Sequence, residues 1–244
     1  MTRYFRSFLT AGLFLSLCLP GLAEGRAARP DSAVPTITVR VYDYAGVTAA
    51  IARRARQESS RLFQVAGIAI EWAVCTIPGR AAPTDPRCQT QPLATDIHLN
   101  ILPRKMAREM MQHHSELGSA VPVPNGFGHR ASVFYHRVDE LAESGGAPRA
   151  LLLGHVMAHE IGHLMLGVNR HSETGLMHVP WDRDQREKAY LGTLLFTDTE
   201  AEQIRRQAED RFRASQISQR CSGPPGGEDE NEVSVPAPSP GEEE

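Results

Sequence analysis

The sequence of 244 residues has no excess of positive charge, no visible internal repeat and no apolar run long enough to cross a membrane. Lysine and arginine number 26 against 29 aspartates and glutamates, and no basic stripe carries interleaved aromatic residues. We therefore expect no nucleic-acid partner. The apolar run at residues 8–19 is short and is followed by Pro20 and Gly21, so we expect no stable membrane insertion.

The ends of the chain differ in composition from its body. Arg3 and Arg6 precede the apolar run, and small residues follow it up to Ala23, which predicts a cleavable signal peptide at residues 1–23 and a secreted or periplasmic product. A linker at residues 24–34 precedes a single domain at residues 35–220. Residues 221–244 carry seven acids, five prolines and no base, so we expect a disordered acidic tail.

Cysteine is scarce, since the chain has four and only three follow the expected signal peptide. Cys75 and Cys88 flank a loop rich in proline and arginine. Because an exported protein meets an oxidising environment, we expect these two residues to form a disulfide. Cys221 is left without an assigned role.

One motif in the chain carries recognisable chemistry, His159-Glu160-Ile161-Gly162-His163. The preceding residues 151–158 are apolar and rich in helix formers, so the motif should lie on a largely buried helix. Residues four apart share one helix face, about 5–6 Å apart at Cβ, so both imidazoles can bind one zinc ion. Glu160 lies beside them and can accept a proton from water. The motif predicts a zinc hydrolase.

A third ligand should come from the residues that follow. Gly167 can end the helix with a positive φ and return the chain toward the metal, which makes His171 the natural third ligand. A glutamate on a later helix, Glu187, is the main alternative, and Glu173 is a weaker one.

With these residues the chain resembles the metzincin zinc peptidases, in a form with a lengthened third-ligand loop that is matrixin- or archaemetzincin-like. Its His171-Ser172 pair is similar to the matrixin branch. The resemblance implies His159, His163 and His171 as zinc ligands, Glu160 as the general base and Met177 as the methionine of the turn beneath the metal. The spacing departs from the family motif, because three residues instead of two separate His163 from Gly167, and three more separate Gly167 from His171. The strict register would place Asn169, a poor zinc ligand, on the metal.

The resemblance also implies a fold and an activity. The expected fold is α/β (α+β), with a mixed twisted sheet packed on an active-site helix and a small C-terminal helical subdomain. The expected function is that of a secreted metalloendopeptidase with one catalytic Zn²⁺, which acts as a monomer on peptide or protein substrates. Two alternatives stay open: a gluzincin-like peptidase with Glu187 as third ligand, and a secreted protein that holds zinc and binds a partner without cutting it. The intact Glu160 argues against the second, because a binding module needs no base.

Residue patterns predict the remaining elements. Alternation and β-branched residues predict strands at residues 36–42, 69–74, 96–102 and 131–138, the last of which could bind an extended peptide if it lies at the sheet edge. Helices are expected at residues 48–63, 105–112 and, after a capping box at residues 197–200, up to about residue 219. We expect His155 and Trp181 to pack in the core or cleft wall. The core faces of the first and last helices should contain Ala50, Ile51, Ala55, Leu62, Ala201, Ile204, Ala208 and Phe212.

Overall fold

The computed structural model describes residues 34–221 except 78, 80–83, 111–115, 125, 146 and 168–170. The expected signal peptide, the linker up to residue 33 and the tail from residue 222 lie outside the described residues, so these boundaries stay predictions. Within the described part of the chain, no helix is both long and apolar enough to cross a membrane.

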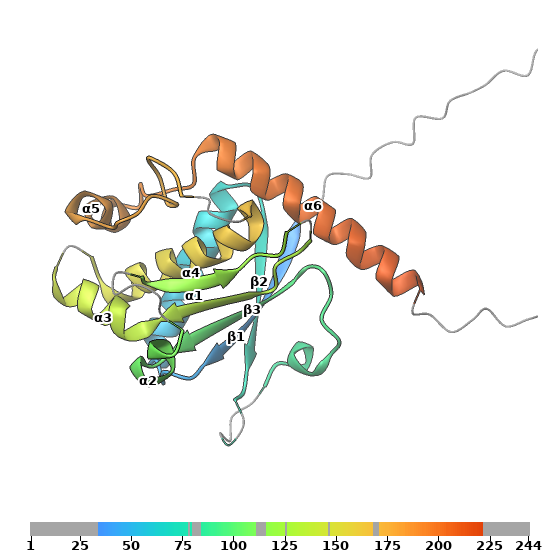
Figure 1. Ribbon diagram of the computed structural model, residues 1–244, viewed down its shortest axis with the longest axis horizontal. Coiled ribbons are helices and arrows are strands. Elements are labelled where there is room, and N and C mark those ends of the chain that lie inside the picture. The colour runs from blue at the N-terminus through green and yellow to red at the C-terminus, as the bar shows by residue number, and fades with distance from the viewer. Residues whose placement is uncertain are drawn as a thin grey trace, which may run out of the picture. The chain divides into compact units, whose positions relative to one another are not determined.

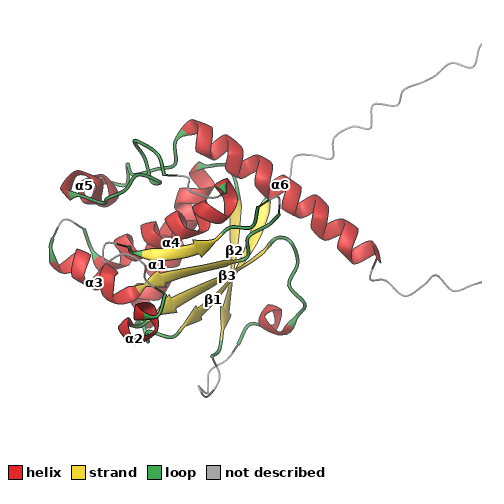
Figure 2. Cartoon of the chain, viewed as in Figure 1, coloured by secondary structure: helices red, strands yellow, loops and turns green. Residues whose placement is uncertain are grey.

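A five-stranded mixed sheet forms the centre of the fold (Figures 1 and 2). Its order is β2-β1-β3-β5-β4, in which β4 pairs antiparallel with β5 and all other neighbours are parallel. The alternation in β3 explains its two faces, because Ile97, Leu99 and Ile101 are buried on one side while His98 and Asn100 point to the other. The strands are β1 (Thr36–Asp43), β2 (Ala69–Cys75), β3 (Asp96–Leu102), β4 (Gly118–Val121) and β5 (Arg130–Phe134).

Two helices cover one face of this sheet and contact each other, α1 (Ala49–Val65) and α4 (Arg149–Leu166). The main hydrophobic core lies between them and the strands, and it includes Phe63 of α1 and Leu152 of α4, both fully buried. The predicted mixed α/β class is therefore confirmed. In α1 the expected core residues Ala55 and Leu62 are buried, whereas Ala50 in the first turn is exposed.

Only shorter segments lie at the opposite face of the sheet in the described part of the chain. A short helix, α2 (Arg104–Arg108), closes a small second core of Leu102, Ala107 and Phe134. A loop that contains the 3₁₀ turn η1 (Pro86–Gln89) lies near the other end, where the predicted disulfide between Cys75 and Cys88 is present with a Cα–Cα distance of 5.6 Å.

The predicted strand at residues 131–138 is too long. Strand β5 ends at Phe134, and helix α3 (Tyr135–Glu143) begins at the next residue. The pattern of residues 135–138 is compatible with a strand or with a helix. In the helix that forms, Val138 is buried in the main core. The condition for peptide binding by this strand is not met, because β5 lies between β3 and β4, and the edge strands are β2 and β4. Helix α2 is shorter than the predicted 105–112, of which residues 111–112 lie outside the described residues.

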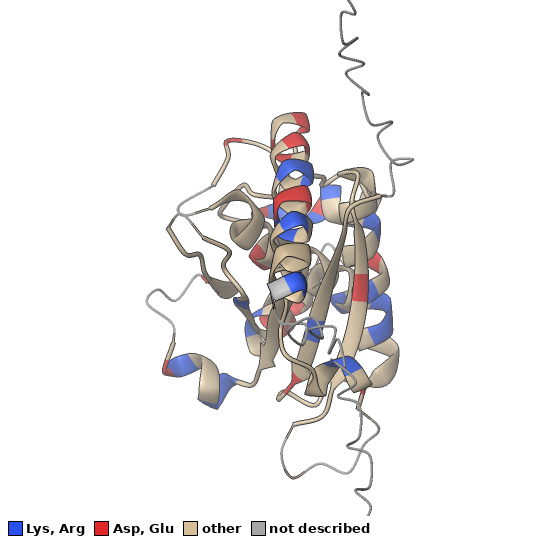
Figure 3. Ribbon diagram, turned by 90° about the vertical axis from the view of Figure 1, so that its right-hand side faces the viewer, with Lys and Arg blue, Asp and Glu red and all other residues tan. Residues whose placement is uncertain are grey.

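Two further helices follow the motif, α5 (Arg183–Leu191) and α6 (Asp198–Cys221). The expected capping box opens α6: the Glu200 N–H donates to Thr197 Oγ1 at 3.3 Å, and the Thr197 N–H donates to Glu200 Oε2 at 2.8 Å. Acidic and basic residues are interspersed along α6 (Figure 3). Its core face buries Ala201, Ile204 and Ala208 as expected.

The predicted burial of Phe212 is wrong. Phe212 is 52% exposed, and its neighbour Arg211 is fully buried in its place. The Arg211 guanidinium donates to the carbonyls of Ala94 at 2.8 Å, Gly128 at 2.7 Å and Leu164 at 3.1 Å. These bonds make it possible to bury a charged side chain, although desolvation lowers the Arg211 pKa to about 10.

Candidate metal centre

Helix α4 carries the motif through a buried part of the molecule. Its residues from Leu152 to Gly162 are all buried, which agrees with the apolar run of the sequence. The helix ends at Gly167, whose φ of 96° is a conformation that favours glycine over residues with a Cβ. The chain therefore leaves the helix four residues after His163.

The two histidines of the motif face each other. His159 Nε2 lies 3.1 Å from His163 Nε2, and the two rings meet edge to face with centroids 4.7 Å apart. The His159 Nδ1 contacts the Leu176 carbonyl at 2.9 Å. Because a carbonyl can only accept, Nδ1 carries the proton and the lone pair of His159 Nε2 points toward His163.

His171 joins this pair from the other side of the Gly167 turn. One ring nitrogen from each of His159, His163 and His171 lies within 4.8 Å of the other two. The rings of His171 and His163 have centroids 4.9 Å apart. Among the described residues, this is the one group of three or more histidine, cysteine or acidic side chains with a geometry that could hold a metal ion.

The alternative third ligands lie elsewhere. Glu187 is exposed on α5, and Glu173 is exposed in the loop after His171; neither belongs to the histidine group. Asn169, the residue of the strict family register, lies outside the described residues. The structure thus brings His171, and neither glutamate, to the motif pair.

Burial keeps the histidines neutral. Desolvation lowers the pKa of His159 to about 4 and, with help from the neighbouring histidines, that of His163 to about 3. Desolvation followed by the charge of His178 also lowers the pKa of His171. Neutral imidazoles are the form that binds metals, so these side chains are ready to bind at neutral pH.

The donor set fits a zinc ion. Two nitrogens that are each about 2.0–2.1 Å from a tetrahedral zinc lie roughly 3.3 Å apart, close to the observed 3.1 Å between the two Nε2 atoms. The hydrogen bond from His159 Nδ1 to a backbone carbonyl is the usual support of a metal-binding histidine. Three neutral nitrogen donors leave a fourth position for water.

Glu160, the residue after His159, lies against Gly118 of the edge strand β4. It is 4% exposed, and a Cβ added to Gly118 of β4 would lie 2.6 Å from its carboxyl carbon and 2.5 Å from the Ser132 carbonyl oxygen. Only a glycine at position 118 leaves room for the Glu160 carboxyl group and the Ser132 carbonyl. Desolvation, followed by the charge of Glu116, raises the pKa of Glu160 to about 8, so it is a stronger base than an exposed carboxylate.

Met177 lies beneath the motif. It is fully buried, and its Sδ would be 2.8 Å from a Cβ placed on Gly162, so the glycine of the motif lets the methionine pack against α4. Trp181 packs beside the motif, where its indole ring meets the His159 ring edge to face with centroids 5.9 Å apart. The indole N–H donates to the His178 carbonyl at 2.9 Å. His155 is fully buried against Trp181, with centroids 6.3 Å apart, as predicted for a packing role.

Side chains of α6 hold the end of α4, and the sequence patterns did not reveal them. Gln203 Nε2 donates to the Leu166 carbonyl at 3.0 Å, and Arg211 donates to the Leu164 carbonyl, so two carbonyls of the last helical turn find partners. The positive charge of Arg211 also suits a helix C-terminus. No local signal marks these residues, because the contact joins segments far apart in the sequence.

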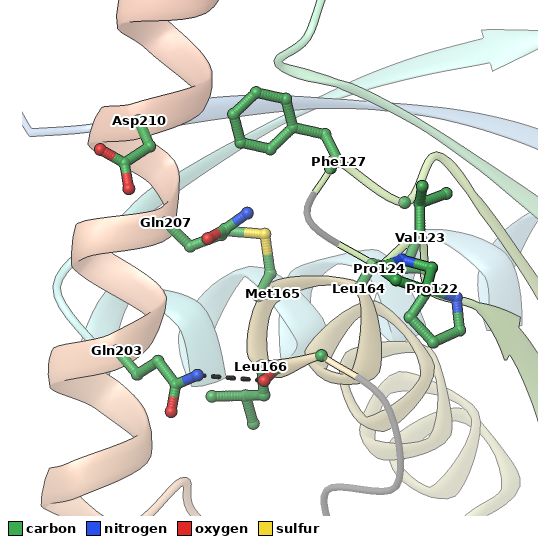
Figure 4. A pocket seen from close by; sticks show the side chains of 13 residues that line it. Pro122, Val123, Pro124, Phe127, Leu164, Met165, Leu166, Gln203, Gln207 and Asp210 are labelled. Carbon is green, nitrogen blue, oxygen red and sulfur yellow. Dashed lines mark hydrogen bonds between the residues drawn. The ribbon is translucent and has the colours of Figure 1, made fainter.

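A cavity of about 510 Å³ lies next to this end of α4 (Figure 4). Its walls come from the loop after β4, the last turn of α4 and one face of α6, and most of its lining side chains are apolar. Two glutamines and one aspartate of α6 are the polar side chains of the cavity lining. The labelled lining residues are Pro122, Val123, Pro124, Phe127, Leu164, Met165, Leu166, Gln203, Gln207 and Asp210.

Comparisons with known proteins give weak similarities in structure alone. No family model matches the sequence, and no curated protein matches it. The chain is similar to the crystal structure of a zinc-dependent peptidase from Methanocorpusculum labreanum, with 16% identity and a TM-score of 0.42, over 68% of this chain and 99% of that chain. It is also similar to archaemetzincin from Methanopyrus kandleri, with 15% identity and a TM-score of 0.39, over 72% of this chain and 97% of that chain. Similarity of this degree does not establish chemistry.

Proposed function

We propose that this protein is a zinc metallopeptidase in which His159, His163 and His171 hold one zinc ion and Glu160 is the general base. One observation carries the proposal: three neutral imidazoles converge on one point, and a buried carboxylate of raised pKa lies next to the first of them in the chain. When bound, zinc lowers the pKa of a water molecule to about 7 and polarises a carbonyl group.

The protein's own groups would then handle the proton. Glu160 accepts the proton of the attacking water and delivers it to the nitrogen of the leaving amine. Burial raises the pKa of Glu160 to about 8 in the metal-free protein, which favours delivery of the proton, and the charge of a bound zinc would favour the carboxylate form that accepts it. The space at Gly118 keeps the carboxyl group beside strand β4, and the bond from His159 Nδ1 to Leu176 keeps the ligand ring in one orientation.

The edge strand supports a peptide or protein as the substrate. Within the described part of the chain, strand β4 pairs with β5 alone, so its other side could pair with an extended peptide. Because Glu160 lies against Gly118 at the start of β4, such a peptide would pass the base. All the proposed site residues come from one chain, which supports action as a monomer, and the disulfide between Cys75 and Cys88 supports export.

Metal analysis and cleavage of a peptide library by the purified protein test this proposal. The wild type should contain one zinc per chain and should cleave in a manner that a chelator abolishes and added zinc restores. The Glu160→Gln variant should keep its zinc but lose cleavage by 10²–10⁴-fold, because an amide cannot accept the proton. A wild type with full zinc and no cleavage across the library would favour the alternative of a zinc-holding binding protein.

A further inference from the structure

Ser172, the residue after His171, is held from three sides. Its N–H donates to the Met177 carbonyl at 3.1 Å, and its carbonyl lies 3.2 Å from His178 Nδ1. Its hydroxyl donates to Glu200 Oε1 in a short hydrogen bond. The backbone next to His171 is therefore fixed by bonds to a loop and to helix α6.

The His171 ring has no such support of its own. It is exposed, its ring lies near those of His159 and His163, and among the described residues no hydrogen bond orients it. His159, by contrast, is oriented by its bond to the Leu176 carbonyl. The position of His171 therefore depends on the backbone on either side of it. Ser172 is the adjacent residue that hydrogen bonds hold in place.

Glu200 connects Ser172 to a rigid element. Its side chain is largely buried, at 7% exposure, and each carboxylate oxygen has a separate partner: Oε1 accepts from the Ser172 hydroxyl and Oε2 from the Thr197 N–H at 2.8 Å. The next residue, Ala201, and Ile204 pack in the main core. The capping glutamate of α6 thus has a second bond that helix capping does not require.

We infer that Glu200 is a positioning residue for the metal site, which holds His171 within reach of His159 and His163 through the Ser172 hydroxyl. The inference rests on the proposed function, because it assigns Glu200 to the same zinc site. Hydrogen-bonded partners behind metal ligands typically change metal affinity by 10–100-fold when they are replaced. A carboxylate suits this role because it can accept from two donors, whereas a glutamine side chain has one accepting oxygen.

The test is a zinc titration of the full chain against a chromophoric chelator, with cobalt(II) absorption as a second measure of the ligand set. Ser172→Ala removes the hydrogen bond from the Ser172 hydroxyl to Glu200 and leaves the capping box intact. Glu200→Gln weakens the same bond while keeping the size of the side chain. Thr197→Ala is the matched control, since among the described residues its hydroxyl accepts from the Glu200 N–H of the capping box and makes no bond to Ser172. Far-ultraviolet circular dichroism checks that each variant is folded.

We expect Ser172→Ala and Glu200→Gln to bind zinc 10–100-fold more weakly and to change the cobalt spectrum. Thr197→Ala should unfold at lower denaturant concentration but bind zinc as the wild type does. In a His171→Ala background, Ser172→Ala should cause no further loss of zinc affinity, because the bond acts through His171.

Three outcomes would overturn the inference while the proposed function stands. These are wild-type zinc affinity in both Ser172→Ala and Glu200→Gln, an equal loss in Thr197→Ala, or a further loss when Ser172→Ala is added to His171→Ala. A wild-type protein that binds no zinc would instead overturn the proposed function, and the inference with it.

Discussion

Replacing Glu160 with glutamine should stabilise the metal-free protein, and the gain should increase with pH. Burial raises the pKa of Glu160 from 4.5 to about 8, so between these values the folded protein keeps a proton that the unfolded chain has released. The wild type therefore loses stability as pH rises from about 4.5 through 8. A glutamine at this position carries no titrating proton and escapes the loss.

The size of the effect follows from the same pKa values. A tenfold difference in proton affinity corresponds to about 1.4 kcal/mol, so the cost of Glu160 is on the order of 1 kcal/mol at pH 5 and on the order of 3 kcal/mol at pH 7. The stability difference between Glu160→Gln and wild type should thus increase by about 2 kcal/mol between these pH values. The buried histidines titrate in both proteins, so their contributions largely cancel.

Urea denaturation with a chelator present, followed by circular dichroism at pH 5 and pH 7, measures this difference. Glu187→Gln on the exposed side of α5 is the control and should give the same stability difference at both pH values. Added zinc should remove the advantage of the Glu160→Gln variant, because a nearby cation favours the carboxylate. A stability difference that stays constant or shrinks between pH 5 and pH 7 would refute the reasoning.

Three further substitutions test other parts of the structure. His171→Ala should weaken zinc binding at least tenfold in a chelator competition, because it removes one of three ligands, whereas Glu187→Ala should leave zinc binding unchanged; the reverse result would favour Glu187 as the third ligand. Gly118→Ala should keep zinc but lower kcat at least tenfold, since the new methyl group meets the Ser132 carbonyl and forces the Glu160 carboxyl to move; wild-type kcat would contradict this reading. Cys75→Ser should lower the free energy of unfolding by about 3 kcal/mol in the oxidised protein, because it opens a short loop, and an equal stability of the two proteins would show that the disulfide is absent in solution.

The elements that could be predicted are those with a strong local pattern. Strand β3 and helix α4 carry their periodicity in consecutive residues, and the motif residues His159 and His163 follow from helical spacing alone. The capping box at Thr197 and Glu200 marks the start of α6 correctly. In each case the residues that form the pattern belong to the helix or strand that the pattern predicts, or lie within a few residues of it.

The elements that could not be predicted depend on distant partners. Strand β4 has four residues and begins with a glycine, and its pairing with β5 decides its structure. Gly118 matters because Glu160 lies against it, a contact that joins residues 42 positions apart. The helical spacing of α6 favoured Phe212 as a core residue, but three backbone carbonyls from other segments bury Arg211 instead.

Helix α6 also determines when the site is completed during synthesis. Because α6 is the last described element to leave the ribosome, the partners of Leu164, Leu166 and Ser172 arrive after every histidine of the metal centre has been made. A growing chain would therefore carry the motif helix with an unsupported end and Ser172 without its partner Glu200. The side chains of α6 thus complete the surroundings of the three histidines only when translation has passed that helix.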